Sequence, residues 1–186
     1  MKRIFDLLTG IILLLLLCIP LIIIALIVKI SSKGPVFFWS IRIGRNNQVF
    51  KMPKFRSMKT DTPNIATHLL EKPDIFLTPV GAILRRYSLD ELPQIFSILK
   101  GDMSFVGPRP ALFNQDDLIS MRKANKINEL MPGLTGWAQV NGRDSLSISE
   151  KVILDKQYME NQSFWFDMKI LWMTFIKAIK SQDISH

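Results

Sequence analysis

Two adjacent acidic residues, Asp90 and Glu91, stand in the segment best suited to chemistry, YSLDELPQ at residues 87–94. A carboxylate acts as a nucleophile, as a general base or as a ligand for a hard cation. The spacing also fits a helix start, because Ser88 and Glu91 are placed as in a capping box and Asp90 is itself a suitable N-cap. Neighbouring helical residues project in different directions, so we expect the two carboxylates to have different roles. The spacing alone leaves capping and catalysis both open.

Two arginines stand in segments that restrict the backbone. Arg109 lies between Pro108 and Pro110, so its guanidinium is presented at reduced entropic cost. Arg143 follows Asn141-Gly142, a pair typical of a tight hairpin turn. A guanidinium fork suits a diphosphate. The alternatives are that Arg109 pairs with a surface carboxylate and that residues 141–143 form only a turn.

A basic segment, KFRSMK at residues 54–59, contains Lys54 and Arg56. It is either a strand that faces bound phosphate or a solvated basic face, and the pattern alone favours the solvated face. His68 and His186 have no neighbours at metal-ligand spacing, so we assign them no function.

The positive charge of the chain is concentrated near its N-terminus. Lys and Arg exceed Asp and Glu by 24 − 16 = 8 in 186 residues, and residues 7–60 contain basic residues but no acidic one. Anionic lipid headgroups or phosphorylated substrates are the expected partners of such a region. The single cysteine, Cys18, excludes an intramolecular disulfide and fits a domain that faces the reducing cytoplasm.

An uncharged apolar run covers residues 11–28. As a helix from Ile4 to Ile30 it would be about 40 Å long, against a hydrocarbon core of about 30 Å. A cleaved signal peptide fits poorly, because the run is long and no cleavage site follows it. A transmembrane helix and a helix broken at Pro20 that enters and leaves by one face both remain. Basic residues at both ends of the run draw both ends toward the cytoplasm, which a straight span cannot satisfy, but a kinked span stays equally open from the sequence alone.

The remaining pattern predicts an α+β, mainly helical fold. Strands are expected at residues 36–39 and 49–52, joined as a short β-hairpin, and a loop is expected at 104–112. Helices are expected at residues 80–87, 92–99, 116–130, 149–161 and 165–180. The last helix combines Trp and Phe with Lys, which suits either packing on the core or an amphipathic helix at the membrane interface. We divide the chain into a membrane anchor at residues 1–32 and a catalytic domain at residues 33–186.

Three long motifs resemble the bacterial sugar transferase family, the monotopic polyprenyl-phosphate phosphoglycosyl transferases. They are KFRSM at 54–58, SLDELPQ with GDMSFVGPRP at 88–94 and 101–110, and PGLTGWAQVNGR at 132–143. The resemblance covers essentially the whole chain, which is similar to the minimal, PglC-type members. Ser40 stands where the family usually has Gln.

The resemblance implies a two-step reaction. Asp90 would attack the β-phosphate of a UDP-sugar and release UMP, and polyprenyl phosphate would then take the phosphosugar from Asp90. Mg²⁺ would be the cofactor, with Asp90 as its ligand. Glu91 would deprotonate or orient the lipid phosphate, and Arg109, Arg143, Lys54 and Arg56 would bind substrate.

The resemblance also implies a cellular location, substrates and partners. The domain would lie on the cytoplasmic face of the bacterial inner membrane on a Pro-kinked re-entrant helix, and would carry out the first membrane step of glycoconjugate assembly. The acceptor would be undecaprenyl phosphate, the donor a UDP-linked N-acetylated amino sugar such as UDP-N,N′-diacetylbacillosamine, and downstream glycosyltransferases would be partners. The alternative from a different class is a non-enzymatic, membrane-tethered basic protein that binds nucleic acid or anionic lipid. We expect no nucleic-acid partner, because no recognisable nucleic-acid motif is present.

Overall fold

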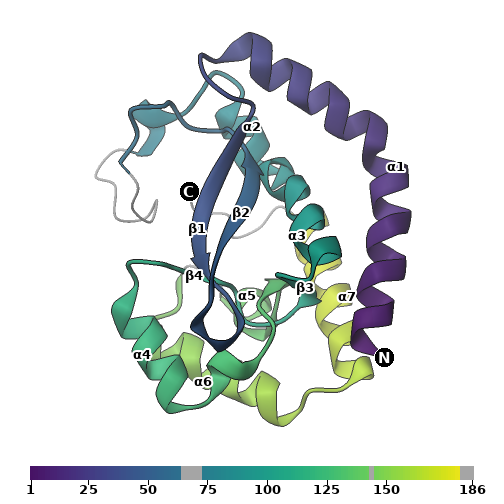
Figure 1. The fold of residues 1–186 in the computed structure, drawn as a ribbon, viewed down its shortest axis with the longest axis vertical. Helices are drawn as coiled ribbons and strands as arrows, with labels where there is room; N and C mark the ends of the chain where they lie inside the picture. Colours follow the sequence, from purple (N-terminus) through teal and green to yellow (C-terminus); the bar gives the residue numbers. More distant parts are fainter. Residues whose placement is uncertain (64–72, 143–144, 181–186) are drawn as a thin grey trace.

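The computed structural model describes residues 1–63, 73–142 and 145–180. In this part of the chain the fold is α+β and mainly helical, which confirms the predicted class (Figure 1). The α-helices are α1 (Lys2–Ser31), α2 (Gly81–Arg86), α3 (Ile95–Lys100), α4 (Asp116–Ala124), α5 (Trp137–Val140), α6 (Ile148–Glu160) and α7 (Phe164–Lys180). The 3-10 helices are η1 (Arg45–Asn47), η3 (Pro73–Phe76), η4 (Leu89–Gln94) and η5 (Ile127–Glu129). The strands are β1 (Phe37–Ile43), β2 (Val49–Phe55), β3 (Ser104–Val106), β4 (Ala111–Leu112) and β5 (Gly133–Thr135).

The apolar helix α1 runs along one side of the molecule and bends part-way along its length (Figure 1). Pro20 lies inside it and removes a backbone donor, which accounts for a bend in an otherwise continuous helix. Among the described residues, α1 is the one helix long and apolar enough to cross a membrane, and 17% of its most apolar part is buried in the protein. The rest of that surface therefore needs another apolar environment.

Both ends of α1 pack against the remainder of the chain. At the first end, buried Asp6 accepts a hydrogen bond from the backbone N–H of Phe105, and Lys2 forms an ion pair with Asp167 of α7. At the other end, Val28 is buried with Phe55 and Leu84. The helix is thus attached twice to one folded unit. The predicted boundary between anchor and catalytic domain at residue 32 stays a prediction.

The predicted β-hairpin is confirmed, with longer strands than expected. β1 and β2 pair in antiparallel register from Phe37 with Phe55 to Ile43 with Val49, and the three-stranded sheet has the order β2-β1-β4. The turn between the strands places Asn46 and Asn47 in the left-handed region, which asparagine tolerates better than most residues. Because side chains alternate along a strand and the register pairs even with even positions, the even-numbered hairpin residues face one side of the sheet and the odd-numbered residues face the other.

Three local predictions were wrong. Residues 104–112 are not merely a loop, because β3 pairs in parallel with β5 and β4 pairs with β1. The predicted helix at 116–130 ends early, at Ala124. Two residues later Lys126 takes a positive φ, and the separate helix η5 follows it. Asn141-Gly142 is not a hairpin turn but follows the C-terminus of α5, where a glycine at positive φ is equally suitable.

The structure confirms core packing for one face of the last helix, and its role as an interfacial helix stays a prediction. Ile170 is fully buried in the main hydrophobic core, together with Ile98, Met103 and Tyr158. The aromatic side chains of Trp165, Trp172 and Phe175 are exposed by 78%, 63% and 56%. One face of α7 therefore packs on the core, and the other presents aromatic rings of the kind that favour a membrane interface.

Candidate active site

Asp90 and Glu91 both lie in η4 and both are largely buried, with side chains 11% and 12% exposed. Neither predicted capping arrangement occurs. Ser88 precedes η4 in the left-handed conformation, with φ of 54°, and its side chain makes no capping hydrogen bond. Asp90 lies inside the 3-10 helix rather than at its N-cap. A non-glycine residue at positive φ stores backbone strain of the kind that gathers at functional sites.

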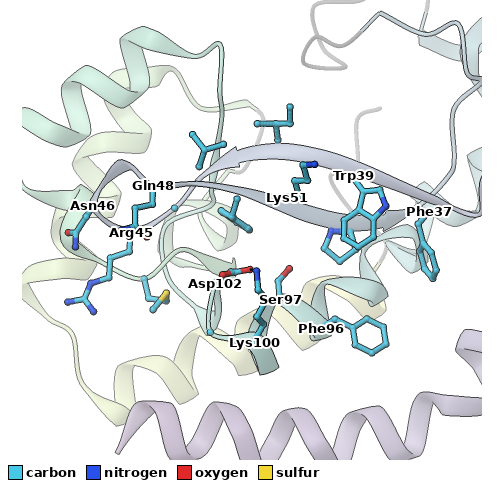
Figure 2. A pocket seen from close by; sticks show the side chains of 17 residues that line it. Phe37, Trp39, Arg45, Asn46, Gln48, Lys51, Phe96, Ser97, Lys100 and Asp102 are labelled. Atoms are coloured by element: carbon cyan, nitrogen blue, oxygen red, sulfur yellow. The ribbon is translucent and has the colours of Figure 1, made fainter.

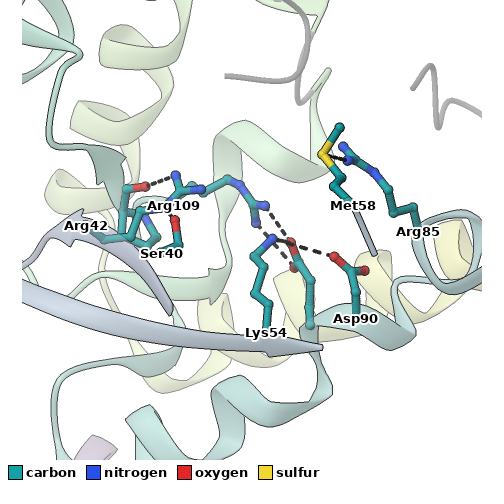
Figure 3. Close-up of polar contacts among 9 residues, drawn as sticks. Ser40, Arg42, Lys54, Met58, Arg85, Asp90 and Arg109 are labelled. Carbon is teal, nitrogen blue, oxygen red and sulfur yellow. Dashed lines mark hydrogen bonds and ion pairs between the residues drawn. The ribbon is translucent and has the colours of Figure 1, made fainter. Parts of the chain in front are cut away.

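Two cations hold Glu91, namely Lys54 and Arg109, and both are labelled in Figure 3. The Nζ of Lys54 donates to Oε1 of Glu91 at 2.7 Å, and the Nη2 of Arg109 donates to the same oxygen at 2.7 Å. The second guanidinium nitrogen of Arg109, Nη1, lies 3.5 Å from Oε2. The prediction that Lys54 belongs to a solvated face was wrong, because its side chain is 15% exposed and points at the carboxylate pair. The structure thus brings three predicted site residues into one contact.

The environment separates the pKa values of the two carboxylates. Burial raises the pKa of Asp90, and the charge of Glu91 adds to this, against the opposing effect of Lys54. Burial alone would also raise the pKa of Glu91, but Arg109 and Lys54 outweigh it and hold that pKa well below its usual range. The nearest ion-pair contact of Asp90 is with Lys54 at 3.9 Å, longer than a hydrogen bond. Two titratable neighbours with diverging pKa values are typical of a division of catalytic roles.

Close backbone packing fixes the loop that carries Arg109. A Cβ on Gly133 would lie 2.1 Å from the nitrogen of Gly107, and one on Gly136 would lie 2.1 Å from the oxygen of Gly107. Only glycine permits this approach. The N–H of Gly107 donates to Thr135 and the N–H of Gly133 donates to the carbonyl of Pro108, both at 2.9 Å. The glycines of two distant motifs therefore join them side by side.

Two further arginines hold the same loop from other elements. Arg42 of β1 donates to the carbonyl of Pro110 at 3.1 Å, and Arg122 of α4 donates to the carbonyl of Arg109 at 2.8 Å. Arg122 also pairs with the buried carboxylate of Asp155 at 2.6 Å. An extended polar network therefore holds the backbone from which the Arg109 side chain projects.

Three site residues were missed from the sequence. Arg42 donates to the hydroxyl of buried Ser40 at 2.9 Å, and burial, followed by the charge of Arg109, lowers the pKa of Arg42 to about 10. Arg85 of α2 lies near enough to Asp90 to oppose the rise of its pKa. Strand alternation was the available signal for Ser40 and Arg42, because even positions of the hairpin share the face of Lys54. Arg85 lies on a separate helix and gave no comparable signal.

Other predicted residues lie elsewhere. Arg56 follows β2, and its Nε donates to the carbonyl of Pro35 at 2.8 Å, near the connection between α1 and β1. Arg143, His68 and His186 lie outside the described residues. The substrate-binding roles of Arg56 and Arg143 therefore stay predictions.

The residues fit a Mg²⁺ ion only when it is shared with substrate. Within the part of the chain that the structure describes, no group of three or more His, Cys, Asp or Glu residues is placed to hold a metal. Glu91 is engaged by two cations, whereas Asp90 presents its carboxylate at the longer ion-pair distance. Mg²⁺ commonly binds through one or two carboxylates plus substrate phosphates and water. Asp90 is the candidate protein ligand.

Among the residues that the structure describes, the site has an excess of positive charge. The side chains of Arg42, Lys54, Arg85 and Arg109 act electrostatically on one another or on the carboxylates of Asp90 and Glu91. Four cations around two carboxylates favour an anionic ligand, and guanidinium groups suit phosphate oxygens. The arrangement can therefore bind phosphate esters next to a buried carboxylate.

Comparison with known proteins agrees with this chemistry. The family model described as bacterial sugar transferase matches residues 1–181. The uncharacterized sugar transferase EpsL of Bacillus subtilis is 41% identical over 99% of the chain and 90% of its own length. The UDP-glucose:undecaprenyl-phosphate glucose-1-phosphate transferase of Escherichia coli is 41% identical over 96% of the chain, and the galactosyl transferase CpsE of Streptococcus agalactiae is 36% identical over 93%. The chain spans 40% and 41% of the lengths of these last two relatives.

Proposed function

The chain belongs to the bacterial sugar transferase family, and we propose that it transfers a sugar 1-phosphate from a UDP-sugar to undecaprenyl phosphate. The products are UMP and an undecaprenyl diphosphosugar. The observation that carries the proposal is the buried carboxylate of Asp90, with its raised pKa, inside a cluster that has a cationic excess. The family assignment favours this enzyme over a non-enzymatic basic protein.

In the first step, Asp90 is the nucleophile. A carboxylate oxygen of Asp90 forms a bond to the β-phosphorus of the donor, the bond from that phosphorus to the bridging oxygen breaks, and UMP leaves. A carboxylate whose pKa is raised by burial is a better nucleophile than an ordinary one once it is ionised. Glu91 is less suited, because Lys54 and Arg109 already engage it.

In the second step, an oxygen of the lipid phosphate attacks the same phosphorus and the bond to Asp90 breaks. The carboxylate is regenerated and the polyprenyl diphosphosugar leaves. Of the two roles expected for Glu91, orienting is favoured over proton removal, because a carboxylate with a pKa well below the usual range is a weak base. Glu91 acts by fixing the directions of Lys54 and Arg109.

The cations divide the task of binding phosphates. Arg109 lies on a loop that Arg42 and Arg122 hold in place, and its guanidinium, which already binds Glu91, suits phosphate oxygens. Lys54 lies within 4 Å of both carboxylates, so it is placed to meet the group transferred to Asp90. Mg²⁺ held by Asp90 would neutralise charge on the diphosphate.

The proposal extends to the sugar of the donor. Relatives of this chain are named for glucose and for galactose, which favours a neutral hexose donor. A UDP-linked N-acetylated amino sugar such as UDP-N,N′-diacetylbacillosamine is the alternative that the sequence resemblance suggests. In either case the product carries a single sugar, so glycosyltransferases that extend lipid-linked glycans would consume it.

The attachment of α1 supports a re-entrant anchor on the cytoplasmic face. Asp6 and Val28, near the two ends of the helix, are 3% and 1% exposed because both contact the same folded unit. A straight span would place its ends about 30 Å apart on opposite sides of the hydrocarbon core. Basic residues near both ends favour the cytoplasmic side for each.

The test is a half-reaction without lipid acceptor. Wild-type protein, Mg²⁺ and one UDP-sugar at a time, from a panel of hexoses and N-acetylated amino sugars, are incubated and analysed for UMP and for intact protein mass. We expect stoichiometric UMP and one added phosphosugar with the correct donor, and neither with Asp90→Asn. Turnover only after undecaprenyl phosphate is added, without a covalent adduct, would contradict the mechanism but not the reaction. No UMP from any donor, with or without acceptor, would contradict the proposed function.

A further inference from the structure

The odd-numbered face of the β-hairpin, opposite the carboxylate pair, lines a pocket of about 900 Å³ (Figure 2). Phe37, Trp39 and Ile41 contribute from β1, and Lys51 and Pro53 from β2. The even-numbered face carries Ser40, Arg42 and Lys54 toward the candidate active site (Figure 3). The hairpin thus separates two sites of different character, and the carboxylates are not part of the pocket.

The pocket exposes aromatic side chains that a purely aqueous setting would disfavour. Phe37, Trp39 and Phe96 line it and are exposed by 37%, 56% and 46%. The volume lies within the range of pockets that hold small ligands, roughly 300–1,000 Å³. An apolar chain in contact with these rings would remove this surface from water.

The wall of the pocket is continuous with the membrane helix. Phe96, Ser97 and Lys100 contribute from α3, and α1 runs along the far side of α3 in Figure 2. The two helices meet closely at Gly10, where a Cβ would lie 2.8 Å from the side chain of Leu99. If α1 lies in the bilayer, the pocket lies within reach of the lipid headgroup layer.

Cations from three elements line the same pocket. They are Arg45 of the hairpin turn, Lys51 of β2 and Lys100 at the end of α3, against one acidic residue, Asp102. Lys100 pairs with Asp102 at 2.9 Å, whereas Lys51 is exposed and makes no ion pair within the described residues. Aromatic rings and amines that line one pocket are complementary to the acyl chain and the anionic headgroup of a lipid.

We propose that this hairpin pocket binds an anionic phospholipid, with an acyl chain against Phe37, Trp39 and Phe96 and the headgroup phosphate at Lys51 and Lys100. The lipid is a ligand separate from the acceptor, and its role is to fix the orientation of the domain on the membrane. This inference concerns lipid binding and does not depend on the reaction proposed above.

The experiment uses full-length protein in phosphatidylcholine nanodiscs that contain an equal fraction of either brominated phosphatidylglycerol or brominated phosphatidylcholine. Bromine on the acyl chains quenches tryptophan fluorescence on contact. The contribution of Trp39 is the difference between wild type and Trp39→Phe. We expect at least two-fold more quenching of this contribution by the glycerol lipid than by the choline lipid.

Charge variants separate the pocket from general attraction to an anionic surface. Lys51→Glu should abolish the preference and Lys51→Arg should keep it, whereas Lys156→Glu, the same charge change at an exposed position on α6, should leave it intact. Equal loss in Lys51→Glu and Lys156→Glu would overturn the proposal in favour of non-specific attraction. Loss of quenching when unbrominated undecaprenyl phosphate is added at low mole fraction would also overturn it, because the pocket would then hold the acceptor chain. No quenching of Trp39 by either lipid would show that no acyl chain enters the pocket.

Discussion

Arg109 and Glu91 meet fork to fork, with Nη2 and Nη1 of the guanidinium lying 2.7 and 3.5 Å from Oε1 and Oε2 of the carboxylate. This pair ties the Pro-flanked loop to η4, so it positions the two parts of the site relative to each other. We predict that Glu91→Gln and Arg109→Met each lower stability, because each breaks a charge-assisted contact between two largely buried side chains.

A double-mutant cycle measures this contact. We expect a coupling energy of about 1–3 kcal/mol between positions 91 and 109 in thermal or denaturant unfolding. The same cycle between Glu91 and Arg86 should give no coupling beyond error, since Arg86 is exposed on α2. Additive effects of Glu91→Gln and Arg109→Met would show that the contact does not hold the site together.

Removal of the nucleophile should abolish chemistry while the fold survives. We predict that Asp90→Asn lowers UMP release by at least about 10³-fold, because the loss of a nucleophile removes the reaction path rather than one contact. Stability should be kept or raised, since Asn removes a buried carboxylate whose ionisation the site opposes. A correctly folded Asp90→Asn protein with wild-type turnover would refute the assignment.

The raised pKa of Asp90 predicts an acid limb in the pH profile. Burial raises this pKa and Lys54 opposes the rise, so as pH falls the nucleophile is protonated earlier than an ordinary aspartate would be. In Lys54→Met the opposing charge is gone and the acid limb of kcat/KM should move to higher pH. Lys156→Met is the control and should leave the limb in place. A limb that stays or moves to lower pH in Lys54→Met would contradict the proposed electrostatics.

The contribution of Arg122 to the loop that carries Arg109 should also be measurable, in both stability and activity. Arg122 joins the carbonyl of Arg109 to the buried carboxylate of Asp155. We predict that Arg122→Met costs about 3–5 kcal/mol of unfolding free energy, because it leaves Asp155 buried and unpaired. The double variant Arg122→Met with Asp155→Leu should recover most of the stability but not the activity, since the loop still lacks its donor. Full recovery of activity would show that Arg122 serves the fold alone.

Local periodicity predicted the hairpin and the two C-terminal helices well, because each buries a face along its own length. The partners of β3 and β4 lie far away in sequence, at Gly133–Thr135 and at Arg42 and Ile43, so no local pattern marked them as strands. Asn141-Gly142 misled for a related reason, because a residue pair that favours positive φ suits a helix end as well as a hairpin.

The residues of the candidate site likewise fall into those that the sequence marked and those that only tertiary packing reveals. Residue type and backbone restriction marked Asp90, Glu91 and Arg109 as candidates and left capping or surface pairing open, whereas the family resemblance supplied their site roles. The structure brings Glu91 and Arg109 into direct contact. The burial of Lys54 was missed, because a basic segment shows its charges but not the carboxylates that a distant helix brings to them. Arg42 and Arg85 act through positions that only the packing of β1 and α2 establishes.

The final prediction concerns the membrane anchor, because the two ends of α1 decide between a span and a re-entrant helix. In a variant with Cys18 replaced by Ser, single cysteines are introduced by insertion after Met1, by Lys33→Cys and by Ile19→Cys. Insertion after Met1 is preferable to replacement of Lys2, whose amine pairs with Asp167. A membrane-impermeant thiol reagent should label neither end in intact cells and both ends in inverted vesicles, because both ends of α1 contact the same domain. Ile19 is 70% exposed in the protein, so protection of Ile19→Cys in both preparations would report cover by the bilayer. Labelling of one end in intact cells and the other in inverted vesicles would show that α1 spans the membrane, and the contacts of Asp6 and Val28 would then have to break on insertion.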